Sequence, residues 1–501
     1  MSVNDRLVGA LAGFAPGLVT LALVGHFWTA GPLAFVPTWN DEIIYWTEIA
    51  SFAEAGFNTG YFTIHEQPAR LTWSPFGAHG PLFPAIVGTV ATVFGWQVYS
   101  GFVFNLVVIT LAAATWAATT RDRIPTAIAA LFLASFWPIA FYLPSNMQEP
   151  LHFAIALLFG ALLPRLSRSA SPSVLASCVA LLVVASLLRP TWALMSIPIL
   201  WMRLRSARPL AIVIGIGITA AAYFAFNWLA APFPNALNAL IANAPTAPAA
   251  AVRDTALRTF SNVQRYFSFE NATTAEVFLR YEVVVVLASC AILAWRRRDV
   301  RGVTAIAILT LGPAVAAVLV AGWVESWRDF RAVAPALLVA LLVAGAERPS
   351  WLRIAGVANV VVALIVIPAF LELHEPRFPR RDARIQQFAA AVSPHLVFRR
   401  DAPRWDDTVL MHVDLLQHPA LGLPPGIGLS FVLDWEAQRL PPRSRYLLLR
   451  REEAEQLRSR IEMVPLADTV LGTLYLNESA ERARTAVDQP PATRPITNHT
   501  P

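Results

Sequence analysis

The chain has 501 residues, of which 56% are hydrophobic and only 14% are charged, and its formal net charge is +6. A soluble domain normally carries about 25% charged residues. All 39 basic residues are Arg, which excludes a P-loop lysine and a Schiff-base lysine. The arginines are divided among many short loops and form no continuous stripe, so nucleic acid is not an expected partner.

Apolar runs separated by short polar clusters predict an all-α polytopic transmembrane bundle of about eleven to thirteen helices, because ~20 apolar residues cross a bilayer. The first run, 7–29, is too long for the apolar part of a signal peptide, and no small-residue cleavage site stands out. The predicted spans are 7–29, 81–97, 100–119, 125–143, 150–164, 173–188, 190–202, 209–230, 281–295, 302–322, 333–347 and 352–371.

Arginine clusters on every second loop predict the orientation of the chain, since cytoplasmic loops carry the excess of Arg. The clusters are Arg165 and Arg168; Arg203, Arg205 and Arg208; Arg296, Arg297, Arg298 and Arg301; and Arg348 and Arg353. The loops 144–149, 231–280 and 323–332, and everything after 372, are then extracytoplasmic. Arg121 conflicts with two full spans in 81–119, so one of those segments is re-entrant or the total is odd.

The first extracytoplasmic loop, 30–80, is too long to be a simple connector. It is rich in Trp, Tyr, Phe and His, which argues against disorder. Apolar residues in 43–57 fall mostly on one helical face, and this predicts an amphipathic helix on the membrane surface. The second long loop, 231–280, is expected to hold another surface helix near 251–268.

Charged residues reach the density of a soluble protein after the last span. This predicts a membrane module over 1–371 followed by a small extracytoplasmic α/β domain over 372–478. Short apolar runs predict strands, and REEAEQLRSR predicts a helix. The expected elements are strands at 407–413, 426–433 and 445–449, a helix at 450–460, and one or two strands within 461–476. The polar, Pro-rich segment 479–501 is expected to be disordered.

The carboxylate pair Asp41-Glu42 directly follows the first span, at the entry to the loop. Such a pair often caps a helix N-terminus, where acids are stabilised by the macrodipole. Neighbouring side chains on a helix also point ~100° apart, so one acid can face a site while the other packs or caps. The sequence alone leaves both roles open.

The order of several short motifs resembles the GT-C membrane glycosyltransferases, in particular the branch of protein O-mannosyltransferases and lipid A aminoarabinose transferases. The motifs are Asp41-Glu42 with Tyr45; His79-Gly80-Pro81-Leu82; Ser145-Asn146-Met147-Gln148-Glu149-Pro150-Leu151; Arg189-Pro190-Thr191; and Arg328-Asp329-Phe330-Arg331 with Pro335. The last one departs from the family's R-Y-x-x-P-x-x-P element, because Phe330 changes the aromatic arrangement and the spacing differs. Arg328 and Arg331 therefore receive no separate roles.

The resemblance implies inverting transfer of a sugar from a polyprenyl-phosphate carrier to a glycan, lipid or protein acceptor. It implies Asp41 as the catalytic base, with Glu42 assisting it or bonding a neighbouring loop. The implied phosphate-binding residues are Arg189, Arg328, Arg331 and His79, because a guanidinium suits a phosphate. The implied substrate-pocket residues are Tyr45, His65, Glu149 and Trp73.

Structural roles compete with several of these assignments. An Arg at a span end is often a membrane anchor, Glu149 is as well placed to cap the next helix as to line a site, and His65 and His79 suit loop structure. Some GT-C branches hold a divalent metal with such acids. No cofactor or metal is expected here, because no second D-x-D cluster completes a coordination sphere.

Three functions remain at this point. The leading one is a glycosyltransferase of the bacterial inner membrane that acts on the cell envelope. The alternative is a transporter or flippase for a lipid-linked substrate, which would favour mid-membrane charges and an internal repeat. Ionisable residues cluster instead at one membrane face, and no repeat is apparent. The third is a scaffold without activity.

Overall fold

The structure is a computed structural model of the whole chain. It describes residues 3–58, 62–64, 66, 80, 82–169, 171–204, 206–230, 236–269, 272–297, 302–321, 328–374, 378–396, 408–415, 419–424, 426–435 and 441–482. The chain forms two compact units. The first comprises Met1–Trp46, His79–Phe83 and Gln97–Pro379, and the second comprises Thr47–Ala78, Pro84–Trp96 and Arg380–Pro501.

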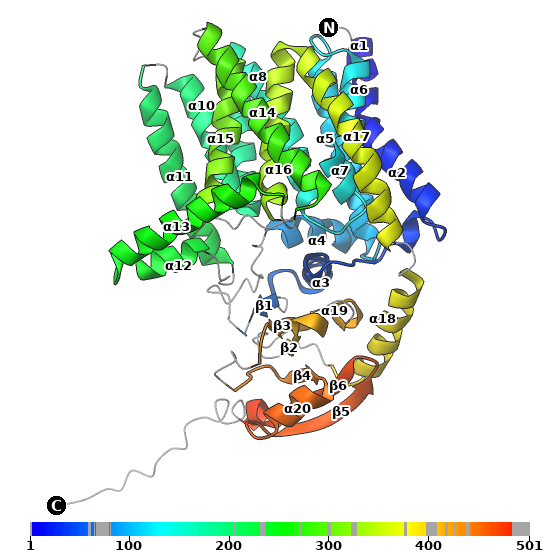
Figure 1. Cartoon of the computed structure of the whole chain (residues 1–501). Helices are drawn as coiled ribbons and strands as arrows, with labels where there is room; N and C mark the ends of the chain where they lie inside the picture. The colour runs from blue at the N-terminus through cyan, green and yellow to red at the C-terminus, as the bar shows by residue number, and fades with distance from the viewer. Residues whose placement is uncertain are drawn as a thin grey trace, which may run out of the picture. The chain divides into compact units, whose positions relative to one another are not determined.

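The first unit is a bundle of helices, most of which run side by side (Figure 1). In chain order they are α1 (Val3–Leu11), α2 (Ala15–Phe27), the start of α3 (Asn40–Ala55), α5 (Ser100–Thr120), α6 (Thr126–Ser135), α7 (Trp137–Tyr142), α8 (Glu149–Arg168), α9 (Pro172–Leu188), the 3-10 helix η4 (Pro190–Met195), α10 (Ser196–Arg203), α11 (Arg208–Leu229), α12 (Ala236–Asn243), α13 (Pro248–Phe267), α14 (Thr274–Arg297), α15 (Val303–Ala321), α16 (Arg328–Glu347) and α17 (Pro349–His374). The predicted transmembrane bundle is confirmed.

Seven segments among the described residues are long and apolar enough to cross a membrane: Val3–Phe27, Ser100–Thr120, Glu149–Arg168, Arg208–Leu229, Thr274–Arg296, Val303–Val320 and Pro349–Glu372. Outward-facing positions on them carry large apolar side chains, for example Val213 at 65% exposure and Leu364 at 70%. Exposed apolar surface of this extent indicates contact with lipid or with another protein, and on helices of this length and hydropathy it is typical of membrane spans.

The remaining predicted spans are shorter or broken. The expected span 125–143 is two helices, α6 and α7, which meet at Phe136, and Pro138 lies in the first turn of the second one. The expected span 190–202 is η4 followed by α10. With α9 and α16, and with each broken pair counted as one crossing, the described chain supplies eleven crossings.

Helix α4 (Leu82–Phe94) bears on the conflict at Arg121. Its 13 residues rise about 20 Å at 1.5 Å each, which is short of a ~30 Å hydrocarbon core. If α4 does not cross, α5 alone joins the first loop to Arg121, and the number of crossings is odd as the charges require.

The centre of the bundle is formed by α8 and α16, which pack against each other, and α8 also packs against α5. A Cβ at Gly160 of α8 would lie 2.5 Å from Leu342 Cδ1 of α16, so the glycine permits the close approach. Small residues at helix contacts have this effect in membrane bundles. The two helices that begin at Glu149 and Arg328 are therefore held at a fixed distance.

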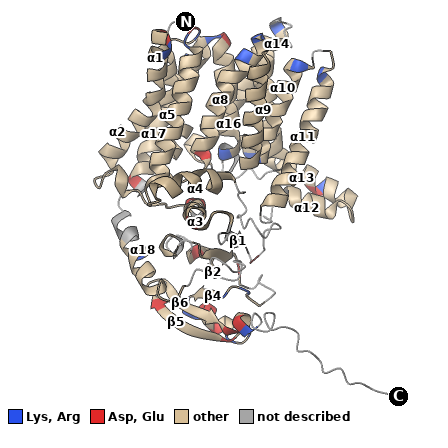
Figure 2. Cartoon of the chain, turned by 180° about the vertical axis from the view of Figure 1, so that it is seen from behind, with Lys and Arg blue, Asp and Glu red and all other residues tan. Residues whose placement is uncertain are grey.

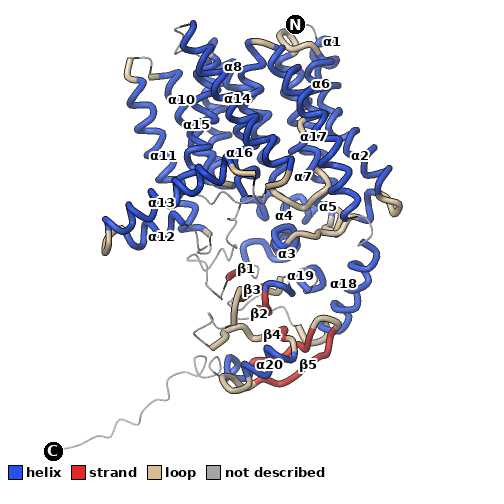
Figure 3. Tube along the Cα trace, viewed as in Figure 1, coloured by secondary structure: helices blue, strands red, loops and turns tan. Residues whose placement is uncertain are grey.

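The second unit contains a six-stranded sheet in the order β1-β3-β2-β4-β6-β5 (Figure 3). Its elements are the end of α3, β1 (Phe62–Ile64), most of α4, most of α18 (Phe378–Val392), β2 (Thr408–His412), α19 (Pro419–Gly422), β3 (Gly428–Val432), β4 (Tyr446–Leu449), α20 (Arg451–Leu457), β5 (Met463–Thr469) and β6 (Gly472–Asn477). The strands β1, β3, β2 and β4 are parallel, and β4, β6 and β5 are antiparallel. The predicted α/β domain is confirmed, with each expected strand and helix present.

Strand β1 comes from the 30–80 loop and pairs in parallel with β3, which the sequence did not predict. Glu66 fastens the same segment, because its carboxylate accepts hydrogen bonds from the backbone N–H groups of Arg443 and Ser444. Ser51 Oγ of α3 also accepts a hydrogen bond from Gly426 N–H at 3.1 Å. The part of the first loop after Trp46 and the C-terminal sheet thus belong to one folded unit.

Both predicted surface helices exist, as α3 and α13, but they differ in burial. α13 is largely exposed, with Leu257 and Phe260 each above 60%. In α3, by contrast, the polar residues Thr47, Glu48 and Ser51 are buried along with the apolar ones, which shows that protein encloses the helix. A one-sided surface helix is therefore the wrong description of α3. Residues 479–482 of the expected disordered tail 479–501 are helical, so that prediction is wrong there, and 483–501 lies outside the described residues.

Candidate active site

Helix directions bring a few charged residues to one end of the bundle. α8 runs from Glu149 to Arg168, and α9 then returns, so Glu149 and Arg189 lie at the same end. Figure 2 shows charged residues, in blue and red, gathered at the end of the bundle where the N-terminus lies. A smaller group of acidic and basic residues lies at the opposite end, near α8 and α16. The second group is far from the arginine-rich loops.

Four of these residues form a continuous ion-pair network. Arg331, in the first turn of α16, donates from Nη1 to Asp41 Oδ2 at 2.7 Å and from Nε to Glu149 Oε1 at 2.9 Å. Arg189 Nη2 donates to the same Glu149 oxygen at 2.9 Å, and its Nη1 donates to the backbone carbonyl of Arg331 at 3.0 Å. The network joins α3, α8, α16 and the C-terminal end of α9.

Burial differs sharply across the network. The Glu149 side chain is 0% exposed, the two arginines are 19% and 20% exposed, and Asp41 is 32% exposed. Two carboxylates and two guanidiniums sum to zero charge, which makes their burial tolerable. Glu149 is therefore the buried centre of the network, and Asp41 is its most exposed member.

Glu42 has a different environment from its neighbour Asp41. Its Oε2 accepts hydrogen bonds from the backbone N–H groups of Thr38 and Trp39, and its Oε1 accepts one from Asn146 N–H at 2.7 Å. Burial raises the pKa of the Glu42 carboxyl, and the N–H donors of Trp39, Thr38 and Asn146 oppose that rise. These bonds favour the loop-bonding alternative for Glu42, with Asp41 alone facing the network.

Asn146 completes the link between the two loops, because its Nδ2 donates to the backbone carbonyl of Glu42 at 3.0 Å. The position of Asn146 depends on Gly101 of α5. A Cβ at Gly101 would lie 1.8 Å from Asn146 Oδ1, so no other residue fits there without displacing the amide. The placement of Asp41 thus depends indirectly on Gly101, because Gly101 makes room for Asn146 and Asn146 holds Glu42, the neighbour of Asp41.

Tyr45 lies one helical turn after Asp41 and is fully buried. Its hydroxyl accepts a hydrogen bond from Gln148 Nε2 at 2.7 Å. Burial, followed by the charges of Asp41 and Glu149, raises the pKa of the Tyr45 phenol well above its ordinary value. The phenol therefore remains protonated and able to donate a hydrogen bond.

His152 is a buried residue of the site that the sequence analysis missed. Trp192 Nε1 donates to His152 Nδ1 at 3.0 Å, which assigns the imidazole proton to Nε2 in the neutral ring. His152 Nε2 and Glu149 Oε2 are both buried without a hydrogen-bond partner among the described residues. The sequence does contain a signal for His152, because an ionisable residue one turn after Glu149 inside an apolar run indicates function.

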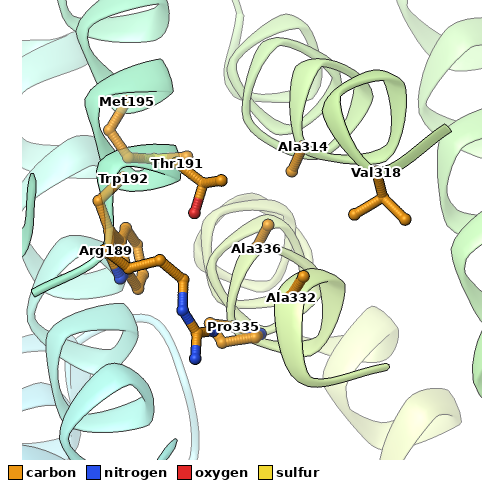
Figure 4. A pocket seen from close by; sticks show the side chains of 9 residues that line it. All are labelled: Arg189, Thr191, Trp192, Met195, Ala314, Val318, Ala332, Pro335 and Ala336. Carbon is orange, nitrogen blue, oxygen red and sulfur yellow. The ribbon is translucent and has the colours of Figure 1, made fainter. Parts of the chain in front are cut away.

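A pocket opens beside the network (Figure 4). The residues that line it are Arg189, Thr191, Trp192 and Met195, Ala314 and Val318 of α15, and Ala332, Pro335 and Ala336 of α16. Figure 4 shows Arg189 at one wall with Pro335 and Ala332 facing it. The pocket therefore combines one cation with an apolar lining.

The structure brings together Asp41, Glu149, Arg189 and Arg331 from the predicted set, with Tyr45 adjacent. His65, Trp73 and His79 lie outside the described residues, as does the side chain of Arg328. The assignments of those four stay predictions. Among the described residues no group of three or more His, Cys, Asp or Glu side chains is placed to hold a metal ion.

No protein-family model matches the sequence, and no curated protein matches it either. A solved structure with a similar fold is ArnT from Cupriavidus metallidurans bound to undecaprenyl phosphate. It is 13% identical, the alignment covers 93% of this chain and 97% of that chain, and the TM-score is 0.49. At this level of similarity the likeness assigns no role to any residue of this chain.

The network has two chemical capacities. The partly exposed Asp41 carboxylate can accept a proton from an attacking hydroxyl. Guanidiniums at the end of an apolar bundle can hold an oxyanion, and the described contacts of each arginine use only two of its five N–H donors. The candidate base, Asp41, and the candidate anion site, Arg189 and Arg331, therefore belong to one hydrogen-bonded network.

Proposed function

We propose that the protein is an inverting glycosyltransferase that moves a sugar from a polyprenyl-phosphate carrier to an acceptor on the extracytoplasmic face of the membrane. The observation that supports it most is the bridge from Asp41 through Arg331 to Glu149 and Arg189. It brings a carboxylate and two guanidiniums together at one end of the bundle, which supports a site for the lipid phosphate of such a donor.

The reaction assigns a role to each residue. The acceptor oxygen attacks the anomeric carbon while Asp41 takes the hydroxyl proton. The bond between that carbon and the phosphate oxygen breaks, and the electron pair leaves with the phosphate. Arg189 and Arg331 stabilise the negative charge that develops on polyprenyl phosphate, because charge-assisted bidentate bonds suit phosphate oxygens. One carboxylate suffices, since the leaving group is already a weak base.

The pocket beside Arg189 supports a lipid-linked donor. Its lining is apolar apart from Arg189 and Thr191, and it lies between η4, α15 and α16. A phosphate next to Arg189 would therefore leave an attached hydrocarbon chain among apolar side chains. We assign the arginine-rich loops to the cytoplasm, which places the network and the C-terminal unit outside it, in a bacterial inner membrane.

The alternative, a transporter or flippase, is less well supported. A transporter places its charged site near the bilayer midplane, between discontinuous helices. Here the described network lies at helix ends, with Glu149 the first residue of α8 and Arg189 following the last residue of α9. We expect no metal requirement. The sugar and the acceptor, whether glycan, lipid or protein, are left to experiment.

Mass spectrometry of envelope glycolipids and glycans, in cells with and without the gene, tests this function. We expect one glycan or lipid species to lose a sugar in the deleted strain, and the intact polyprenyl-phosphate sugar to accumulate. Loss of the same sugar with the lipid-linked sugar accumulating on the cytoplasmic side would support a flippase instead, and an unchanged glycan profile would contradict the proposed function.

A further inference from the structure

The Arg331 guanidinium holds two carboxylates at once, and this has a consequence for the order of events at the proposed site. Nη1 lies 2.7 Å from Asp41 Oδ2, and Nε lies 2.9 Å from Glu149 Oε1. A carboxylate in a direct ion pair is a poorer proton acceptor than a free one, because the cation stabilises its charged form. A guanidinium that is already neutralised likewise attracts a phosphate less strongly.

The two partners of Arg331 are not equivalent. Glu149 is fully buried and also bound to Arg189, so that pair is fixed in the interior. Asp41 is 32% exposed, which makes the Asp41–Arg331 contact the one that solvent screens and a ligand can reach. An arriving anion will therefore compete for Arg331 with Asp41 before it competes with Glu149.

We propose that the Asp41–Arg331 ion pair is a resting-state lock, which the phosphate of the donor opens by taking over the Arg331 guanidinium. This inference rests on the proposed function. In the locked state Asp41 is masked. When phosphate oxygens engage Arg331, Asp41 loses this ion pair and turns to the acceptor hydroxyl. The lock makes the binding order compulsory, with the lipid-linked donor first, and it keeps the base inactive until the leaving group is in place.

The lock makes an unusual prediction about binding, which farnesyl phosphate tests as a short polyprenyl phosphate without a sugar. Removing the Asp41 carboxylate should tighten binding, because Asp41 then no longer competes with the phosphate for the Arg331 guanidinium, while Glu149 remains bound to Arg331. We expect Asp41→Asn to bind farnesyl phosphate about fivefold more tightly than the wild type, the effect of a partly exposed ion pair. Titration of the purified full-length protein in detergent measures it.

Two controls separate the lock from a general change of charge. Glu54→Gln removes one acidic charge from the same helix, and it should leave the affinity within about twofold. The double variant Asp41→Asn/Arg331→Ala should bind no more tightly than Arg331→Ala alone, because the gain requires the guanidinium. Thermal unfolding of each variant checks that the fold is retained.

The possible results differ in what they overturn. Binding by Asp41→Asn that is equal to or weaker than wild type contradicts the lock, and so does a gain that persists without Arg331. In both cases the proposed transferase survives if Arg189→Ala and Arg331→Ala still weaken binding. A wild-type protein that does not bind farnesyl phosphate at all contradicts the proposed function itself.

Discussion

Two regions of the helical bundle each hold a carboxylate among apolar helices, and they differ in what surrounds it. Glu149, at the start of α8, binds two guanidiniums through one oxygen. Glu282 of α14 is bonded by the Asn359 amide of α17 at 3.0 Å. Glu282 Oε2 and Asn359 Oδ1 are both buried without a hydrogen-bond partner among the described residues.

The surroundings of Glu149 compensate a negative charge, whereas those of Glu282 offer only an amide. A buried charge is tolerated where opposite charges compensate it, and it is costly where only an amide faces it. Glu149 also lies at a helix end, while Glu282 lies nine residues into α14, within the apolar span. We expect negative charge to be indispensable at Glu149 and dispensable at Glu282.

The largest effect on stability should come from Glu149→Gln. The change keeps the shape of the side chain but leaves Arg189 and Arg331 without their shared anion. Breaking a buried pair in this way costs about 3–5 kcal/mol. Thermal unfolding in detergent should therefore show a large fall in Tm, with loss of donor turnover. An unfolding midpoint equal to that of the wild type would mean that Glu149 does not anchor the network.

A smaller effect is expected from Gly101→Ala, which changes a residue with no direct contact to the network. The new Cβ would displace Asn146 and with it the loop that fixes Glu42 and Asp41. We expect a loss of about 1–3 kcal/mol in stability and a fall in kcat of about tenfold or more.

Gly217→Ala in α11 is the matched control for that variant, because a Cβ there meets no atom within 4 Å. A glycine replaced by alanine in an exposed helix should gain up to about 1 kcal/mol. Equal kinetics for both alanine variants would show that Asn146 does not position Asp41.

The sequence predicted the parts of this site whose signal is local. The order of the spans, the α/β elements, and the candidates Asp41, Glu149, Arg189 and Arg331 all depend on short segments. Which residues meet depends on how α8, α9 and α16 pack, and the sequence left Glu149 undecided between a helix cap and a site. The same limit applies to Glu42, whose carboxylate accepts hydrogen bonds from nearby Thr38 and Trp39 but also from Asn146, 104 residues away.

Two further features were not predicted, strand β1 and the break at Phe136, and both depend on contacts between distant parts of the chain. Strand β1 has three residues and joins a sheet whose other strands begin at Thr408, so no periodicity within the 30–80 loop announces it. The break at Phe136 has a local cause in Pro138, but Pro also occurs inside intact helices such as α8 and α15. Only the surrounding packing decides between a kink and a break.

The smallest effect should come from Glu282→Gln. Glutamine keeps the oxygen that accepts from Asn359 Nδ2 and adds an N–H that can donate to Asn359 Oδ1. We expect stability within about 1 kcal/mol of wild type or slightly higher, and unchanged turnover. Comparison with Glu149→Gln in the same thermal assay uses one chemical change at two positions. A large loss at Glu282 would show that its charge, too, has a role.

Turnover of a polyprenyl-phosphate sugar by the purified protein in proteoliposomes, with wild type and Asp41→Asn compared side by side, tests the central claim most directly. We predict that the wild type releases polyprenyl phosphate, and that Asp41→Asn is slower by a factor of about 10² to 10⁴ while it still folds and binds the lipid phosphate. Release by Asp41→Asn at the wild-type rate would contradict the assignment of this network as the active site.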